Sequence, residues 1–321
     1  MRSMYFPCRI SGKTARRALA PMLVAAWFTS MSAGRTVVHA QQPIQLFLSA
    51  VDGDEKPVTD LRAEEVEIQV DGATCPTSRF ETIDWPTKLT VMVDNSSVFN
   101  DSLRQLREAL RAFVNALPPT MEVSLLSTAP APRFIYKQGS DRVKLMSSID
   151  LITPDSAAPR FIDALAEAAD RAVKEKAGKE KNNFFPVFFI LGNNGVEGSN
   201  PRDYQVNKLF KQTLDTAATV HVVMLSNSSR QLDIGTGTNQ IEVGLKLTQL
   251  TGGRYEAIAA QTRLTTLLPE FATQIAKSQV RQSHQYRITC QPPVGSKPQR
   301  ITAATKRDGI SAALTFDGRV P

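Results

Sequence analysis

Two hydrophobic patterns divide the chain. Between residues 44 and 83, apolar and polar positions alternate, most clearly over 66–70, and this period of two is typical of half-buried strands. The pair Asp71-Gly72 follows, which is a strong signal for a tight hairpin turn. Residues 286–290 alternate in the same way. We expect strands from the two ends of the chain to meet in one small β module.

The middle of the chain has a different pattern, in which short apolar runs are separated by amphipathic stretches. Its most apolar run is 184–191, whereas 103–114 places its leucines at helical spacing beside charged residues. This alternation predicts an α/β fold with a doubly wound, mostly parallel, Rossmann-like sheet. The expected strands are 89–93, 121–126, 134–137, 184–191, 220–225 and 254–258. The expected helices are 103–114, 143–152, 161–176, 203–217, one through 245 and 250, and 264–275.

The first forty residues are typical of an export signal. Basic residues precede an apolar run from Ala18 to about Ala33, and small residues lead up to Ala40. We expect cleavage between Ala40 and Gln41, and the alternative is an uncleaved membrane anchor. The predicted organisation is a signal peptide at 1–40, an N-terminal β module at 41–86, the α/β domain at 87–279 and C-terminal strands at 280–321.

The charge of the chain changes once this signal is set apart. The first forty residues hold six of the 38 basic residues and none of the 31 acidic ones, which leaves 32 basic against 31 acidic. A nearly neutral chain does not favour nucleic acid or an anionic membrane as a partner. We therefore expect an exported protein, periplasmic or secreted, with no membrane insertion after cleavage.

Cysteine usage bears on the compartment. Cys8 belongs to the expected signal, and the remaining Cys75 and Cys290 lack the close spacing of a zinc site. In an oxidising compartment these two can form a disulfide that ties the ends of the chain together. Two separately buried thiols are the alternative.

One motif carries a resemblance to a known family. A predicted strand ends in Asp94-Asn95-Ser96-Ser97-Val98 and a helix follows, which resembles the Asp-x-Ser-x-Ser motif of von Willebrand factor type A domains. The order of elements agrees over about 88–276, and the flanking strands resemble those of bacterial secreted proteins that carry this domain. The resemblance implies an adhesion site for Mg²⁺, where Asp94 and Ser96 match the first two ligand positions.

Three departures from the family's pattern weaken the expected metal site. Val98 stands in the place of the second serine, Pro159 in the place of the threonine, and Asn194 in the place of the final aspartate. A hydrocarbon cannot coordinate an ion, and an amide brings no negative charge. We therefore expect a degenerate site and no cofactor, with Asp94, Ser96 and Asn194 as the candidate ligands for Mg²⁺ if any ion binds.

The resulting functional prediction is a non-enzymatic interaction or adhesion module. Its partner is expected to be another protein or an envelope macromolecule, bound through loops after the parallel strands. The candidate contact residues in those loops are Asn95, Ser97, Arg160, Asn193 and Glu197. One alternative is an envelope scaffold protein without a ligand site. A second is a hydrolase or phosphatase-like enzyme that uses Asp94, although the second carboxylate of such an enzyme is missing.

Overall fold

A computed structural model of the chain describes residues 42–178, 183–226, 238–293 and 298–320, all within one compact unit, Ala40–Pro321. The expected signal peptide and its cleavage site between Ala40 and Gln41 lie outside these residues, so export stays a prediction. No helix in the described ranges has the length and apolar character needed to span a membrane.

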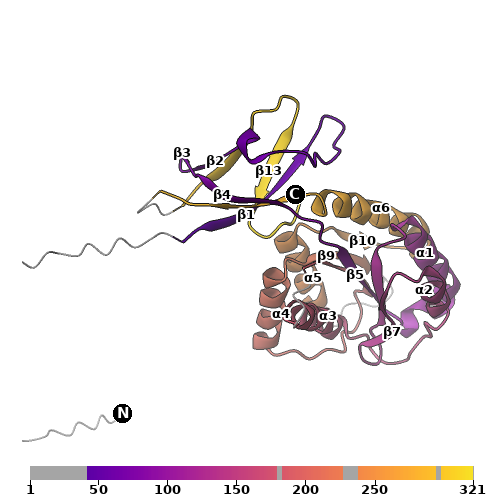
Figure 1. The fold of residues 1–321 in the computed structure, drawn as a ribbon. Coiled ribbons are helices and arrows are strands. Elements are labelled where there is room, and N and C mark those ends of the chain that lie inside the picture. Colours follow the sequence, from indigo (N-terminus) through magenta and orange to yellow (C-terminus); the bar gives the residue numbers. More distant parts are fainter. Residues whose placement is uncertain (1–41, 179–182, 227–237, 294–297, 321) are drawn as a thin grey trace, which may run out of the picture. The chain divides into compact units, whose positions relative to one another are not determined.

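A six-stranded sheet forms the centre of the α/β part (Figure 1). Its strands are β5 (Thr87–Val93), β6 (Glu122–Ser127), β7 (Arg133–Gly139), β8 (Phe185–Asn193), β9 (Thr219–Leu225) and β10 (Tyr255–Ile258), in the spatial order β10-β9-β8-β5-β6-β7. Neighbouring strands are parallel except for β6 and β7, which are antiparallel. Every residue of β8 is buried, which explains why this strand is the most apolar run of the sequence.

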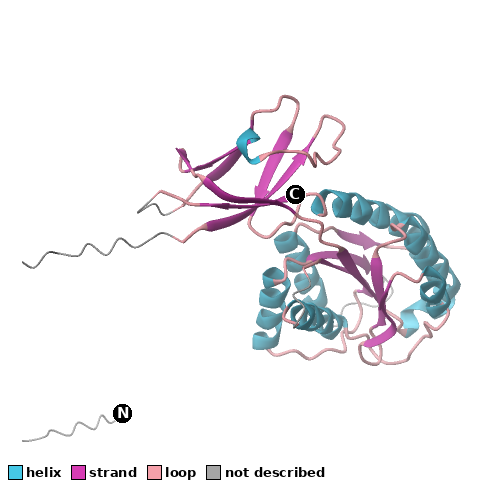
Figure 2. Ribbon diagram, viewed as in Figure 1, coloured by secondary structure: helices cyan, strands magenta, loops and turns pink. Residues whose placement is uncertain are grey.

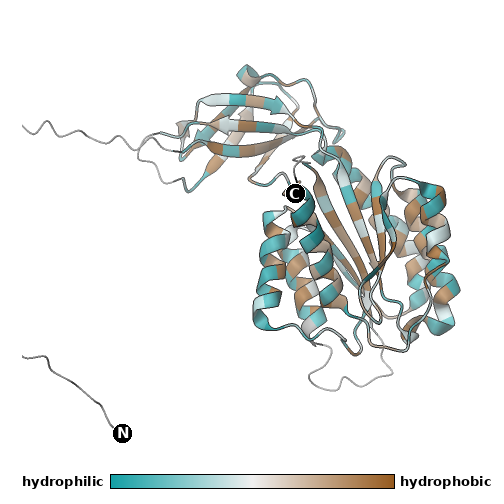
Figure 3. Ribbon diagram, turned by 60° about the horizontal axis from the view of Figure 1, so that its bottom comes forward, coloured by the Kyte–Doolittle hydropathy of each residue, from teal (hydrophilic) through white to brown (hydrophobic). Residues whose placement is uncertain are grey.

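Helices cover both faces of this sheet (Figures 1 and 2). One face carries α1 (Leu103–Ala116), α2 (Arg142–Ile149) and α6 (Leu264–Gln282), and the other carries α3 (Phe161–Lys176), α4 (Asp203–Asp215) and α5 (Thr238–Thr251). The helices turn apolar residues toward the sheet and polar residues outward (Figure 3). This burial of one stripe per helix is what the amphipathic stretches of the sequence predict.

Aromatic side chains fill the core on the side of α1 and α6. The ring centroid of Phe189, from β8, lies 4.8 Å from that of Phe113 and 5.4 Å from that of Phe271. All three rings are fully buried. These contacts attach α1 and α6 to the middle of the sheet.

The observed topology confirms the predicted fold class. Counted along the chain, the strands of the central sheet have the order 3-2-1-4-5-6 from β7 to β10, which is the doubly wound arrangement. With helices on both faces and one antiparallel edge strand, this is a von Willebrand factor type A-like fold.

Strands from both ends of the chain form a separate antiparallel module, as predicted. One sheet has the order β13-β1-β11-β4 and the other β12-β2-β3. The strands are β1 (Ile44–Val51), β2 (Val66–Val70), β3 (Ala73–Thr74), β4 (Thr77–Thr82), β11 (Tyr286–Cys290), β12 (Ile301–Thr305) and β13 (Ser311–Thr315). Asp71 and Gly72 form the β2–β3 turn with φ values of 50° and 83°, as a type I′ hairpin requires.

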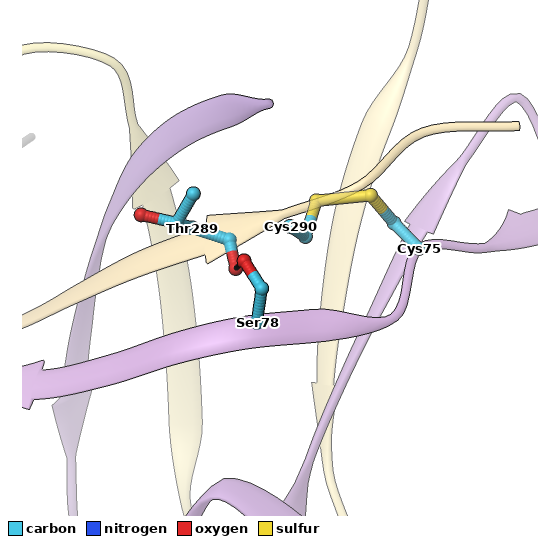
Figure 4. Close-up of a disulfide and its surroundings, with 4 residues drawn as sticks. All are labelled: Cys75, Ser78, Thr289 and Cys290. Carbon is cyan, nitrogen blue, oxygen red and sulfur yellow. Dashed lines mark hydrogen bonds between the residues drawn. A yellow bond between two sulfur atoms is a disulfide. The ribbon is translucent and has the colours of Figure 1, made fainter. Parts of the chain in front are cut away.

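A disulfide joins Cys75 and Cys290, which confirms the predicted pairing (Figure 4). Cys75 follows β3 and Cys290 ends β11, so the bond links the two sheets of the β module across 215 positions of sequence. Both cysteines are almost fully buried. Beside the bond, the hydroxyl of Ser78 donates to the carbonyl oxygen of Thr289 at 3.1 Å.

Two helices, α2 and α6, differ most from their predicted bounds. The last helix was expected to end near residue 275, where its apolar positions stop, but α6 continues to Gln282 as a more polar extension that leads directly into β11. The helix predicted at 143–152 begins one residue earlier, where the side chain of Asp141 caps α2 by accepting the Lys144 N–H at 3.0 Å, and it ends three residues earlier, at Ile149.

Candidate functional site

The candidate site lies where the strand order of the central sheet reverses. β5 and β8 are neighbours there, and their connections leave in opposite directions, so their carboxyl ends flank the position at which open α/β sheets bind ligands. Asp94 directly follows β5, and Asn193 is the last residue of β8. The predicted site residues are therefore placed at the switch point of the sheet.

Asp94 is buried and hydrogen-bonded through both carboxylate oxygens. Its Oδ1 accepts the backbone N–H of Ser96 at 2.8 Å, and its Oδ2 accepts from the side-chain amide of Asn193. Only 1% of the residue is exposed. Burial raises the pKa of Asp94, and the hydrogen bonds from Ser96 and Asn193 oppose that effect. The carboxylate is held by groups of the protein itself.

Asn193 connects the two sides of the switch point. Its Nδ2 donates to Asp94 and lies 3.4 Å from Oγ of Ser96, and its Oδ1 accepts the N–H of Gly195 at 2.6 Å. The side-chain amide of Gln240, in the first turn of α5, donates to the carbonyl oxygens of Asn193 at 2.5 Å and Gly195 at 3.1 Å. Asn193, predicted as a contact residue for a partner, thus makes a buried hydrogen bond to Asp94, and the candidate role of Asn194 as a ligand stays a prediction.

Asn95 joins the loop after β5 to two other loops. Its side-chain amide exchanges hydrogen bonds with the backbone of Ala129 and donates to the carbonyl oxygen of Thr153 at 3.0 Å. Its own carbonyl accepts the N–H of Asp155 at 2.8 Å. The side chain is buried and fully bonded inside the molecule. These bonds position the loops around Asn95, and its predicted contact with a partner stays a prediction.

Glu197, in the loop between β8 and α4, caps the N-terminus of α3. Its carboxylate accepts the backbone N–H groups of Phe161 at 3.2 Å and Ile162 at 3.4 Å, and the hydroxyl of Ser199 accepts that of Asp163 at 3.0 Å. These are the first N–H groups of α3, which have no partner within the helix. Burial raises the pKa of Glu197 in spite of the hydrogen bonds to Ser199, Ile162 and Phe161. Glu197 therefore binds the β8–α4 loop to the start of α3.

The residues of the site do not fit a divalent cation. Among the described residues, Asp94 is the one carboxylate at its centre, and its oxygens already accept hydrogen bonds. Val98, in the place of the second serine, packs against the apolar core, and Pro159 is buried. Within the described residues, no group of three or more His, Cys, Asp or Glu side chains could hold a metal ion. Magnesium prefers an octahedral shell of oxygens, which this set does not supply.

Above these buried groups, the loops present an exposed surface, called here the loop surface. Ser97 and Arg160, both predicted as contact residues, are exposed, and Arg160 is held by Pro130 O at 3.0 Å and by Asp163 at 3.2 Å. Val196, 52% exposed, adds an apolar side chain in the β8–α4 loop. The loop surface consists of Ser97, Asn100, Ser156, Arg160, Val196 and Asn200.

Two contributors to the site were not predicted from the sequence. Gln240 is fully buried and holds the end of β8, yet its segment shows only an ordinary amphipathic pattern. Ser199 completes the cap of α3 from another loop, 36 positions away. A cap is normally sought directly before its helix, so no local signal marks Ser199.

No family model matches the sequence, and no curated protein matches it either. Solved structures with a similar fold include a von Willebrand factor type A protein from Catenulispora acidiphila, with 11% identity over 86% of this chain and 72% of that chain, at a TM-score of 0.48. An aerotolerance-related membrane protein from Bacteroides fragilis has 12% identity over 59% and 99%, at 0.42. BatB from Bacteroides thetaiotaomicron has 11% identity over 60% and 100%, at 0.44.

Proposed function

We propose that this protein is an exported, non-enzymatic binding module that recognises another protein or an envelope macromolecule through the loop surface. The observation that carries this proposal is the set of buried side chains beneath that surface. Asn95, Asn193 and Glu197 each join segments that are distant in sequence. Loops that are already ordered lose little conformational entropy on binding, which favours recognition.

The exposed groups of the loop surface suit polar recognition around one apolar contact. Ser97, Asn100, Ser156 and Asn200 offer hydrogen-bonding groups, and Arg160 offers a guanidinium group that its two intramolecular contacts hold in place. Val196 supplies apolar area within the same surface. Binding residues are often carried in this way on loops positioned by a rigid scaffold.

Export is supported by the buried disulfide, because such bonds persist in oxidising compartments. The proposal of a non-enzymatic protein is supported by Asp94, whose carboxylate is buried and bonded on both oxygens. A nucleophilic or general-base carboxylate needs to reach a substrate atom within hydrogen-bonding distance. The enzyme alternative therefore has little support at this site.

Two matched valines allow the surface to be tested. Val196 lies in the loop surface, and Val280 lies in the last turns of α6, away from the carboxyl ends of β5 and β8; they are 52% and 46% exposed. A photo-reactive amino acid placed at each position in producing cells identifies neighbours by mass spectrometry. The purified neighbour is then titrated with the unmodified protein and with Val196→Asp and Val280→Asp.

We expect a partner that cross-links from position 196 and loses affinity by about tenfold or more with Val196→Asp, but not with Val280→Asp. Equal binding by all three proteins would place the recognition surface elsewhere. Absence of adducts from position 196 would favour the scaffold alternative.

A further inference from the structure

The side-chain amide of Asn193 lies between the two groups that match the first ligand positions of an adhesion site. Its Nδ2 donates to Oδ2 of Asp94 and is 3.4 Å from Oγ of Ser96. An amide nitrogen has two N–H donors, so one nitrogen can serve two acceptors from a single position. Asp94 and Ser96 would have to hold an ion through their side-chain oxygens, and the amide contacts one oxygen of each.

We propose that the amide of Asn193 takes the place of the divalent ion and locks the loops at the switch point without any metal. The neutral amide of Asn193, at the end of β8, contacts both the carboxylate of Asp94 and the hydroxyl of Ser96 in the loop after β5. The loops that an ion would hold together are then held by the protein itself.

The anchoring of Asn193 keeps the amide in this position. Its Oδ1 accepts the N–H of Gly195 at 2.6 Å, which fixes the orientation of the amide plane, and Gln240 holds the backbone carbonyl of Asn193 at 2.5 Å. A Cβ at position 195 would lie 2.6 Å from Oδ1 of Asn193, so the glycine permits this close approach. To admit an ion, the amide would have to break its bonds to both Asp94 and Gly195.

This arrangement also changes which partner the loop surface can accept. An ion with an open coordination position attracts an acidic side chain of the partner, and an internal amide offers no such position. Recognition through the loop surface is thus independent of divalent cations and of a partner carboxylate. This lock depends on the contacts of Asn193 and not on the identity of any partner.

The test measures the thermal unfolding of four proteins under two conditions, in chelator and in about 0.1–10 mM Mg²⁺ or Mn²⁺. This range of concentrations would detect even a weak divalent-ion site. They are the unmodified protein, Asn193→Ala, Asn193→Asp and the matched control Asn200→Asp. The last makes the same chemical change at an exposed position of the same loop. Asn193→Asp replaces the donor with a second carboxylate beside Asp94.

We expect the ion to leave the midpoint of the unmodified protein and of Asn200→Asp unchanged. Asn193→Ala should lower the midpoint by about 5 °C with or without the ion. In chelator, the unfolding midpoint of Asn193→Asp should be lowered at least as much as that of Asn193→Ala. Addition of Mg²⁺ or Mn²⁺ should restore part of this loss, because an ion can then bridge two carboxylates. A fall without recovery would overturn the proposal, since it would mean that the amide does not occupy an ion's position, and so would an unchanged midpoint for Asn193→Ala.

A second measurement needs no variant, in case the substituted proteins do not fold. In the ¹⁵N-labelled protein, the side-chain NH₂ protons of Asn193 should exchange slowly with solvent and keep their chemical shifts on addition of Mg²⁺. Saturable displacement of these signals at sub-millimolar Mg²⁺ would show that an ion enters the site and would overturn the proposal.

Discussion

The side-chain amide of Asn95 pairs with the backbone of Ala129 in both directions, accepting its N–H at 2.9 Å and donating to its carbonyl oxygen at 3.1 Å. This is the pattern by which a neighbouring strand would satisfy the same residue. The pair lies beyond the end of β6, where the sheet no longer supplies partners. The side chain of Asn95 therefore satisfies backbone groups of the loop after β6 that no strand pairs with.

Loss of this pair should destabilise the fold. Asn95→Ala leaves the buried N–H and carbonyl of Ala129 without their partners, for which we expect a loss of about 3 kcal/mol in the free energy of unfolding. Urea denaturation measures it. Asn100→Ala, at an exposed position nearby, should change stability by less than about 0.5 kcal/mol. Equal effects of the two substitutions on stability would contradict the role of Asn95 in positioning the loops.

The cap of α3 by Glu197 can be measured in the same way. Glu197→Ala should lower the free energy of unfolding by about 1–2 kcal/mol, and Glu197→Gln by less, because an amide keeps one acceptor oxygen but loses the charge that favours a helix N-terminus. Hydrogen exchange at the N–H groups of Phe161 and Ile162 should become faster. Glu64→Ala, at an exposed position of the β module, is the control and should leave that exchange unchanged.

The disulfide should contribute strongly to the stability of the β module. Replacing Cys75 and Cys290 together by Ala removes a link across 215 positions, and we expect a loss of about 3–5 kcal/mol. Because both cysteines are buried, reductant alone should act slowly on the folded protein and rapidly once urea unfolds it. Rapid reduction under native conditions would show that the bond is accessible from solvent.

His221 should make stability depend on pH. Burial, together with the charge of Arg254, lowers the pKa of His221 to about 4, and its Nδ1 accepts the Arg254 N–H at 3.1 Å. The unfolded chain binds this proton from about pH 6.5 downward. Stability is therefore lost as the pH falls from about 6.5 to about 4, by about 3 kcal/mol in total from this group.

The comparison that isolates this effect uses two variants of the same strand. His221→Asn keeps an acceptor for Arg254 but removes the titrating group, so its stability should depend less on pH than that of the unmodified protein. Val222→Ala also removes buried side-chain atoms and should lower stability by the same amount at every pH. An unchanged pH dependence in His221→Asn would contradict the assignment.

The fold could be predicted from the sequence because its signals are local. The apolar run that becomes β8, the helical spacing in α1 and the Asp71-Gly72 turn each depend on neighbouring residues. The pairing of Cys75 with Cys290 followed from the number of cysteines and the expectation that the chain ends meet.

The site was predicted less completely because its contacts are long-range. Successive side chains at the end of a strand point in opposite directions, so whether Asn193 or Asn194 faces Asp94 depends on the register of β8 against β5. The cap that Glu197 forms on α3 was not predicted, because only the folded arrangement of the loops brings the two together.

Calorimetric titration of Mg²⁺ and Mn²⁺ into the chelator-treated protein tests the central claim, that the loop surface is held and functions without metal. We predict no saturable heat up to millimolar ion, because Asn193 and Ser96 already satisfy the carboxylate of Asp94. Saturable binding at sub-millimolar ion that disappears in Asp94→Ala would contradict the account.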